Sequence, residues 1–361
     1  MISDLSIWVK LLLSMVTAGV ISFLMTPPVK HFAEKVGAID VPKDERRVHD
    51  HPIPRMGGLA IFIGFVLSLI CFVDVTTQVL GILLGALIIA VMGAVDDIVS
   101  LNAWVKLAGQ IVAAIVAIRC GIVFETISNP NAFAEQTTIV LEHYLSLALT
   151  LLWIVGCTNA VNLIDGLDGL AVGVSTISSM TMLIVAFFVA EPNVVIILAA
   201  LSGACLGFIP YNFNPAKIFM GDVGSQLLGF VLSTVSIIGM FKMHTLITFL
   251  VPLLALAVPL ADTAFAFFRR IIHGQSPFHA DKGHFHHRLL ALGLNQKQAV
   301  AVLYGISAVF GLIAVLLAGS GVLVRTVCAV CAFLIALAVW FYVFWHNPNL
   351  HRRRKNRENQ E

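Results

Sequence analysis

Long runs of apolar residues, separated by short polar segments, follow one another along most of this chain. A helix that crosses the hydrocarbon core of a bilayer needs about 20 apolar residues, so each run of this kind predicts one membrane-spanning helix. The runs begin near residues 5, 58, 79, 104, 144, 169, 194, 225, 246, 299 and 322. We therefore expect an all-α fold, a polytopic integral membrane protein with about eleven transmembrane helices.

The composition agrees with this pattern. Of the 361 residues, 59% are hydrophobic and only 12% are charged, whereas roughly 25% of the residues of a soluble domain are charged. We expect residues 1–345 to form a single transmembrane domain and residues 346–361 to form a basic cytoplasmic tail. The expected surroundings are the lipid bilayer, with no nucleic-acid partner and with a homodimer left open.

The positions of lysine and arginine predict the orientation of the helices, because these residues mark the cytoplasmic flanks of membrane proteins. The tail carries Arg352, Arg353, Arg354, Lys355 and Arg357. This places the C-terminus in the cytoplasm and, with an odd number of spans, the N-terminus outside. Alternation then gives the cytoplasmic loops 26–57, 96–103, 159–168, 212–224 and 269–298. Most of the 22 Lys and Arg residues lie in these loops, at their edges or in the tail; the exceptions are Lys10, Arg119, Lys242 and Arg325.

An acidic pair lies where the third apolar run meets the second predicted cytoplasmic loop. Asp96 and Asp97 end the third apolar run, and Lys106 opens the fourth. Two carboxylates at a helix end cost little when they are hydrated, so they can simply solvate a loop. The alternative is that they bind a hard cation, for which carboxylate oxygens are suitable ligands.

The segment NAVNLIDGLDGL carries polar side chains at intervals of three residues, which are Asn159, Asn162, Asp165 and Asp168. Neighbours in this series share a helix face, but the first and the last would point apart on an unbroken helix. Gly166 and Gly169 therefore predict that the helix ends here and that the backbone lines a site. Oxygen ligands from Asn and Asp suit Mg²⁺ or Mn²⁺.

Two further cytoplasmic segments are suited to phosphate. FMGDVGS, from Phe219 to Ser225, places Asp222 between two glycines at the start of the eighth predicted helix. Glycines let backbone N–H groups approach phosphate oxygens, and a helix N-terminus favours an anion. The loop from Pro42 to Gly58, which includes Arg55, is basic and suited to anionic headgroups or phosphates.

The loop after the ninth apolar run contains a histidine-rich cluster of His284, His286, His287 and Arg288. Such a cluster can ligate Zn²⁺, or its cationic groups can hold a pyrophosphate. The carboxylates of the other loops already supply ligands for a metal, so we prefer the hypothesis that this cluster binds phosphate.

A secondary transporter would have a similar number of helices, but its binding site is expected near the middle of the bilayer. Within the apolar runs, Asp262 is the fair candidate for such a charge. The other unusual polar residues gather at the cytoplasmic ends of helices, which favours chemistry at the membrane surface.

These segments, in this order, resemble the polyprenyl-phosphate N-acetylhexosamine-1-phosphate transferase family. HFHHR, from His284 to Arg288, is similar to the H-x-H-H pattern of the branch that uses UDP-GlcNAc and undecaprenyl phosphate. The phospho-MurNAc-pentapeptide transferases are the alternative branch. The D-D-x-x-D pattern common in the family is incomplete, because its third position is Ser100.

The resemblance implies a bacterial plasma-membrane enzyme with a cytoplasmic active site. Its reaction would transfer GlcNAc 1-phosphate from UDP-GlcNAc to undecaprenyl phosphate, with release of UMP, as the first membrane step towards a cell-envelope polysaccharide or teichoic acid. The cofactor would be Mg²⁺, with Mn²⁺ as the alternative, and Asn162 and Asp222 match its ligands.

The remaining site residues fall into two groups. The catalytic candidates are Asp96, Asp97 and Asp165, where the acidic pair matches either a base for the lipid phosphate or part of the metal and phosphate environment. The substrate-binding candidates are Lys106, Asn159, Gly166, Leu167, Asp168, Asn212, Phe219, His284, His286, His287, Arg288 and Arg55. Within this set, the resemblance assigns Lys106 to a phosphate, and it assigns to the uridine Gly166, Leu167, Asp168, Asn212 and Phe219.

Overall fold

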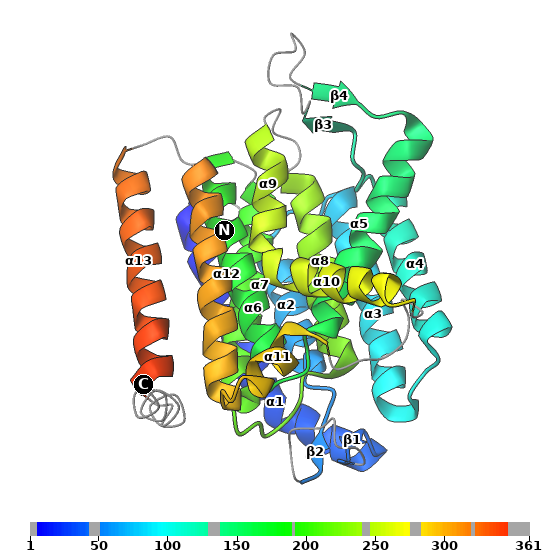
Figure 1. The fold of residues 1–361 in the computed structure, drawn as a ribbon. Coiled ribbons are helices and arrows are strands. Elements are labelled where there is room, and N and C mark those ends of the chain that lie inside the picture. The colour runs from blue at the N-terminus through cyan, green and yellow to red at the C-terminus, as the bar shows by residue number, and fades with distance from the viewer. Residues whose placement is uncertain are drawn as a thin grey trace, which may run out of the picture.

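The computed structural model describes residues 6–42, 51–128, 138–189, 192–239, 246–274, 283–318 and 322–345. In these residues the chain forms thirteen helices and two short hairpins (Figure 1). The helices are α1 (Ile7–Val36), α2 (Gly58–Phe72), α3 (Thr77–Val99), α4 (Ala103–Arg119), α5 (His143–Leu163), α6 (Leu170–Val189), α7 (Pro192–Asn212), α8 (Gly221–Gly239), α9 (Leu246–Ala255), α10 (Ala257–Ile272), α11 (Phe285–Ala291), α12 (Gln296–Ala318) and α13 (Val322–Trp345). The antiparallel hairpins pair β1 (Ile39–Asp40) with β2 (Ile53–Pro54), and β3 (Thr126–Ser128) with β4 (Thr138–Val140).

Eight helices of the described chain are long and apolar enough to cross a membrane: α1, α3, α5, α6, α7, α8, α12 and α13. This confirms the prediction of a polytopic, helical membrane protein. The remaining predicted spans coincide with α2, which has 15 residues, with α4, which has 17 residues, and with the divided pair α9 and α10. The number of eleven spans stays a prediction.

The loop that follows the first apolar run is shorter than predicted, because α1 continues beyond this run to Val36. Pro27 and Pro28 lie inside this helix without ending it. The added turns carry charged side chains, with Lys30 3.9 Å from Glu34 one turn later. The helix ends at Gly37, whose φ of +77° is the left-handed conformation that glycine adopts readily.

A break divides the ninth apolar run between α9 and α10, and α10 lies across the bundle rather than along it (Figure 1). Pro259, in the first turn of α10, has no N–H to donate to the carbonyl of Ala255, four residues earlier, so one helical hydrogen bond is missing at this break. The hydroxyl of Ser178, on α6, donates to that carbonyl instead. The carbonyl is thus satisfied inside the apolar bundle, where an unpaired one would be costly.

The helix α8 forms the centre of the bundle and is buried along almost its whole length. It packs against α3 and α5, while α1 packs against α2 and α7. The start of α2 approaches α8 closely, since a Cβ on Gly58 would lie 2.1 Å from the backbone nitrogen of Gly224. This contact fixes the N-terminus of α8 beside the loop that precedes α2.

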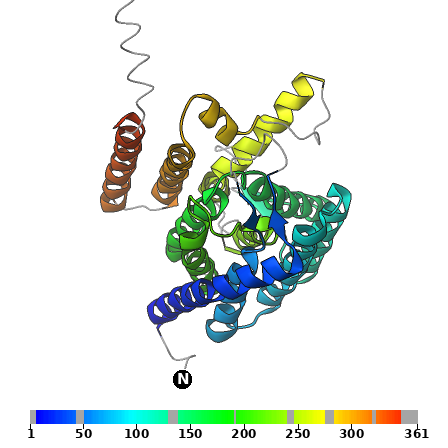
Figure 2. The same cartoon turned by 90° about the horizontal axis from the view of Figure 1, so that it is seen from below.

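The two ends of the bundle differ. The β3–β4 hairpin lies at the upper end in Figure 1, and the β1–β2 hairpin and α11 lie at the lower end. Figure 2, seen from below, shows the β1–β2 hairpin lying over that lower end and α10 projecting from the bundle. The polar segments singled out in the sequence therefore converge below the apolar helices.

Candidate active site

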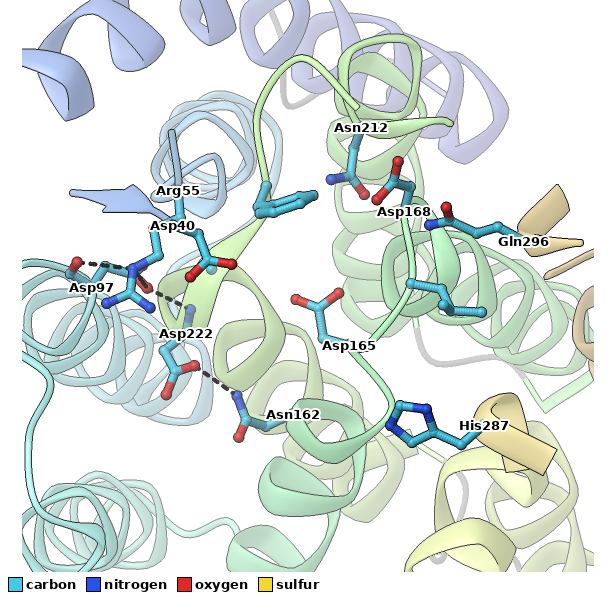
Figure 3. Close-up of a pocket in the computed structure, with 14 residues that line it drawn as sticks. Asp40, Arg55, Asp97, Asn162, Asp165, Asp168, Asn212, Asp222, His287 and Gln296 are labelled. Carbon is cyan, nitrogen blue, oxygen red and sulfur yellow. Dashed lines mark hydrogen bonds and ion pairs between the residues drawn. The ribbon is translucent and has the colours of Figure 1, made fainter. Parts of the chain in front are cut away.

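A pocket of about 370 Å³ opens at the lower end of the bundle (Figure 3). Its lining comes from β1, the loop before α2, the ends of α3, α5 and α7, the α5–α6 and α7–α8 loops, the start of α8, α11 and the start of α12. The lining residues are Asp40, Arg55, Asp97, Asn162, Asp165, Gly166, Leu167, Asp168, Asn212, Phe219, Gly221, Asp222, His287 and Gln296. Most of the site residues expected from the sequence are thus brought together.

The N-terminus of α8 is capped by the carboxylate of Asp97. The backbone N–H of Asp222 donates to Oδ1 of Asp97 at 3.1 Å, and the N–H of Val223 donates to Oδ2 at 3.4 Å. Gly221 allows this approach, because its φ is +72° and a Cβ there would lie 2.3 Å from Oδ2 of Asp97. The anion that this helix end favours is therefore a side chain of the protein itself.

Arg55 joins the loop before α2 to the end of α3. Its Nε donates to the backbone carbonyl of Asp97 at 3.0 Å and lies 3.6 Å from Oδ1 of the same residue. Arg55 also forms a parallel β-bridge with Phe219, whose N–H donates to the carbonyl of Pro54 at 2.8 Å. Arg55 and Phe219 consequently reach the pocket as one unit, although they come from distant parts of the chain.

Lys106 lies between two carboxylates and contacts the pocket residue Asp222. Its Nζ is 2.8 Å from Oδ2 of Asp222 and 3.1 Å from Oδ2 of Asp96. The other oxygen of Asp96 accepts from the N–H of Leu101 at 2.6 Å. Asp96 is therefore fully engaged by a cation and a backbone donor, behind the pocket rather than in its lining.

A chain of amide side chains supports Asp222. Its Oδ1 accepts from Nδ2 of Asn162 at 3.2 Å, and its Oδ2 accepts from Nε2 of Gln226 at 2.9 Å. Gln226 in turn accepts from Gln110 at 2.9 Å, and Gln110 accepts from Asn159 at 2.6 Å. Asn159, which we expected to bind substrate, is thus placed behind Asp222 and orients it through two glutamines.

Asp165 and Asp168 lie in the loop between α5 and α6, so the predicted break in the NAVNLIDGLDGL segment is confirmed. Asp165 occupies the middle of the pocket (Figure 3). Burial, and then the negative charges of Asp222, Asp97 and Asp168, raise the pKa of Asp165 to about 8. The raised pKa favours the protonated carboxyl group, and a cation that enters the pocket would favour the ionised form.

The opposite side of the pocket is held by hydrogen bonds between loops. Nδ2 of Asn214 donates to Oδ2 of Asp168 at 2.9 Å and to Oε1 of Gln296 at 2.7 Å. Oδ1 of Asn212 accepts from the N–H of Gly169 at 3.1 Å. These bonds fix the α5–α6 loop against the α7–α8 loop and the start of α12, and they leave polar edges facing the pocket.

The histidine-rich cluster reaches the pocket through one residue, His287 (Figure 3). His284 and His286 are buried, with exposed fractions of 7% and 3%, and do not belong to the lining. Arg288 is exposed, and its guanidinium lies over the ring of Phe265 at 4.2 Å from the centroid. The substrate-binding roles expected for these residues stay predictions.

The described part of this cluster does not offer a zinc site. Among the residues that the structure describes, no group of three or more His, Cys, Asp or Glu side chains could hold a metal ion. His279 and Asp281 belong to the same loop but lie outside the described residues.

The pocket instead suits a magnesium ion that is bound partly by protein and partly by substrate. Mg²⁺ usually binds one or two carboxylates together with substrate phosphates and retained water, rather than a cage made only of protein. Asp222, Asn162 and Asp165 offer hard oxygen donors to the same pocket. The donor set thus suits a magnesium ion whose coordination is completed by a bound diphosphate.

Several residues of the site were not among the candidates predicted from the sequence. Asp40 and Gln296 line the pocket, and Gln110 and Gln226 support Asp222. The two glutamines carried a usable signal, because a polar side chain inside an apolar run usually faces a partner. Asp40 and Gln296 lie in polar segments of the sequence, where a further polar residue does not indicate a site.

The apolar helices and the acid-rich pocket at one end define an integral membrane protein with a candidate active site. A model of glycosyl transferase family 4 matches residues 79–240. The chain is 40% identical, over 86% of its length and 85% of the relative's, to a Bacillus subtilis protein named probable undecaprenyl-phosphate N-acetylglucosaminyl 1-phosphate transferase. The chain therefore belongs to glycosyl transferase family 4, and the resemblance seen in the sequence is confirmed.

Two further relatives show the breadth of the similarity. A Mycobacterium tuberculosis protein named decaprenyl-phosphate N-acetylglucosaminephosphotransferase is 36% identical over 80% of this chain and 78% of its own length. A Staphylococcus saprophyticus protein named phospho-N-acetylmuramoyl-pentapeptide-transferase is 31% identical over 72% of this chain and 83% of its own length. Both branches weighed in the sequence are thus represented among the relatives.

The buried position of His286 predicts a pH-dependent stability. Burial, and then the neighbouring His287, lower the pKa of His286 to about 4, whereas a histidine in an unfolded chain titrates near 6.5. Between these pH values the unfolded chain binds a proton that the folded chain does not, so acidification through this window destabilises the fold. We expect the melting temperature of the detergent-solubilised protein to fall between pH 6.5 and 4.

His286→Gln should reduce this acid-induced decrease by about 2 °C or more. The exposed His143 provides the control, since His143→Gln should keep the wild-type pH profile. An unchanged acid sensitivity in His286→Gln would show that His286 does not titrate in this way.

Proposed function

We propose that this protein transfers N-acetylglucosamine 1-phosphate from UDP-GlcNAc to undecaprenyl phosphate, giving undecaprenyl-diphosphate-GlcNAc and UMP. The observation that carries this proposal is the pocket, in which acidic, amide and cationic side chains meet at the end of a membrane bundle. The name of the Bacillus subtilis relative, which is similar along most of both chains, supports the sugar and the lipid. The product would be the first lipid-linked intermediate of a cell-envelope polymer.

In the proposed reaction an oxygen of the lipid phosphate attacks the β-phosphorus of UDP-GlcNAc. The bond between the β-phosphorus and the oxygen bridging to the α-phosphate breaks, and UMP leaves with that oxygen. The lipid phosphate is already ionised at neutral pH, so it needs little help from a base. Orientation of the two substrates therefore supplies much of the rate.

One group of residues is suited to the uridine of the substrate, and another is suited to its diphosphate. Asp168 and Asn212, held rigidly between loops, present polar edges suited to the uridine, and Phe219 offers a ring on which the base can stack. Arg55 and Lys106 supply positive charge beside the carboxylates, where a diphosphate would need it.

The acidic pair supports this mechanism by orientation. Asp97 holds the N-terminus of α8, and Asp96 holds Lys106, so both carboxylates already have partners. Asp222 and Asn162 would hold Mg²⁺, with Asp165 beside them. When bound, the ion would neutralise the diphosphate and the charge that develops on departing UMP.

The membrane arrangement follows from the same proposal. We infer eleven crossings, in which α2, α4 and the α9–α10 pair complete the eight long apolar helices. The end of the bundle that holds the pocket would face the cytoplasm, because Arg55 lines this pocket and Lys106 contacts its residue Asp222. The N-terminus would then lie outside and residues 346–361 inside, in a bacterial plasma membrane.

Transfer of phospho-MurNAc-pentapeptide is the second candidate, because a relative of that name is 31% identical to this chain. We favour GlcNAc because relatives named for it are 40% and 36% identical, over larger shares of the chain. The two functions differ in the nucleotide sugar that is consumed, so one assay separates them.

Purified protein should convert UDP-GlcNAc and undecaprenyl phosphate into an organic-extractable lipid, with one UMP released per lipid formed. A panel containing UDP-GlcNAc, UDP-GalNAc and UDP-MurNAc-pentapeptide would be tested with radiolabelled sugar, and UMP would be quantified separately. We expect UDP-GlcNAc to be the preferred donor. Preferential use of UDP-MurNAc-pentapeptide would establish the second candidate, and UMP release without labelled lipid would contradict both.

Asp222→Ala should abolish transfer at any Mg²⁺ concentration while the protein remains inserted and monodisperse. The carboxylate of Asp222 joins Lys106, Asn162 and Gln226, so its loss removes both the metal ligand and the centre of this network. Asp74→Ala, at an exposed position between α2 and α3, is the matched control and should keep normal activity. Near-normal turnover of Asp222→Ala at saturating Mg²⁺ would overturn the assignment.

A further inference from the structure

Asp262, on α10, is almost fully buried, with 1% of its surface exposed. One carboxylate oxygen, Oδ2, lies 2.7 Å from Nδ1 of His284. The other, Oδ1, accepts from the backbone N–H of Phe285 at 2.6 Å. In the tautomer of His284 that carries a proton on Nδ1, this nitrogen donates to the carboxylate. Asp262 therefore binds the first turn of α11 through the side chain of His284 and the backbone N–H of Phe285.

This contact stabilises a helix that is too short to be stable alone. The helix α11 has seven residues, and an isolated helix of that length is unstable in water. A second contact with α10 is aromatic, since Phe265 lies 5.8 Å from the ring of Phe285 and carries the guanidinium of Arg288 over its face. Asp262 supplies the polar part of this docking, one turn of α10 away from the aromatic part.

Contacts continue from Asp262 to the pocket. The ring of His284 is parallel to that of His286 within 8°, with 5.9 Å between centroids. His286 packs on the α5–α6 loop so closely that a Cβ on Gly166 would lie 2.4 Å from its Nε2. The next residue, His287, lines the pocket itself. The docking of α11 on α10 thus determines where His287 stands relative to the loop that carries Asp165.

We propose that Asp262 is a positioning residue, which fixes α11 so that His287 meets the nucleotide sugar in the pocket. This inference rests on the proposed function and adds to it a residue outside the pocket. The sequence had suggested Asp262 as the charge of a transport pathway, whereas its carboxylate is fully paired within the protein. A buried carboxylate is costly unless it is paired, and here the pairing serves the geometry of the site.

The test compares Asp262→Ala and Asp262→Asn with the wild type in the lipid-product assay, and measures the Kd of UDP-GlcNAc by calorimetry. Asp262→Asn preserves volume and an acceptor for Phe285, so it remains informative if the alanine variant does not fold. We expect both variants to raise the KM and the Kd for UDP-GlcNAc, by about tenfold or more for alanine. The KM for undecaprenyl phosphate should stay within about twofold.

Thr263→Val is the matched control on the same helix, because the buried hydroxyl of Thr263 has no partner among the described residues. It should leave both KM values unchanged. His287→Ala combined with Asp262→Ala should be no worse than the larger single effect, because one residue acts through the other.

Three results would overturn the proposal: both Asp262 variants within about twofold of the wild type for UDP-GlcNAc, equal increases in both KM values, or additive effects in the double variant. The first two would show that Asp262 has no role in the site or only a structural one. A wild type that makes no lipid product would instead contradict the proposed function, and the change in Kd would still decide the role of Asp262.

Discussion

The contact between the Asp97 carboxylate and the N-terminus of α8 is the constraint on which the rest of the site depends. It joins α3 to the most buried helix of the bundle, and it sets the position of Asp222, whose own N–H takes part in the contact. Gly221 is required because a side chain there would displace Asp97. Arg55 completes the arrangement, because its side chain bonds to the end of α3 and its backbone segment forms a β-bridge with the α7–α8 loop.

The surrounding charges follow from the cost of placing acids at the end of an apolar bundle. Each carboxylate beside the N-terminus of α8 has a cation or several N–H donors: Asp96 has Lys106, Asp97 has Arg55, and Asp222 has Lys106 and two amides. Asp165 differs, because burial among like charges raises its pKa to about 8. A cation bound in the pocket together with an anionic substrate would offset the repulsion between this carboxyl group and the neighbouring carboxylates.

Local pattern predicted much of this structure. Apolar runs located the helices, and the glycines of NAVNLIDGLDGL predicted the break that leaves Asp165 and Asp168 in a loop. Partners far apart in the chain could not be predicted, because they depend on how helices approach one another. Gln110 meets Gln226, and Asp262 meets His284, only through such packing. The same limit applies to Arg288, whose guanidinium lies over the ring of Phe265, while its predicted role at the phosphates stays a prediction.

The central claim is that the acid-rich pocket binds a divalent ion together with the diphosphate of a nucleotide sugar. Electron–nuclear double resonance of Mn²⁺ bound to the purified protein in the presence of UDP-GlcNAc tests it directly. The account predicts strong coupling of the ion to ³¹P and no coupling to a directly bound histidine nitrogen. A directly coordinated nitrogen, or the absence of phosphorus coupling, would contradict it and would move the metal to the histidine-rich cluster or away from the substrate.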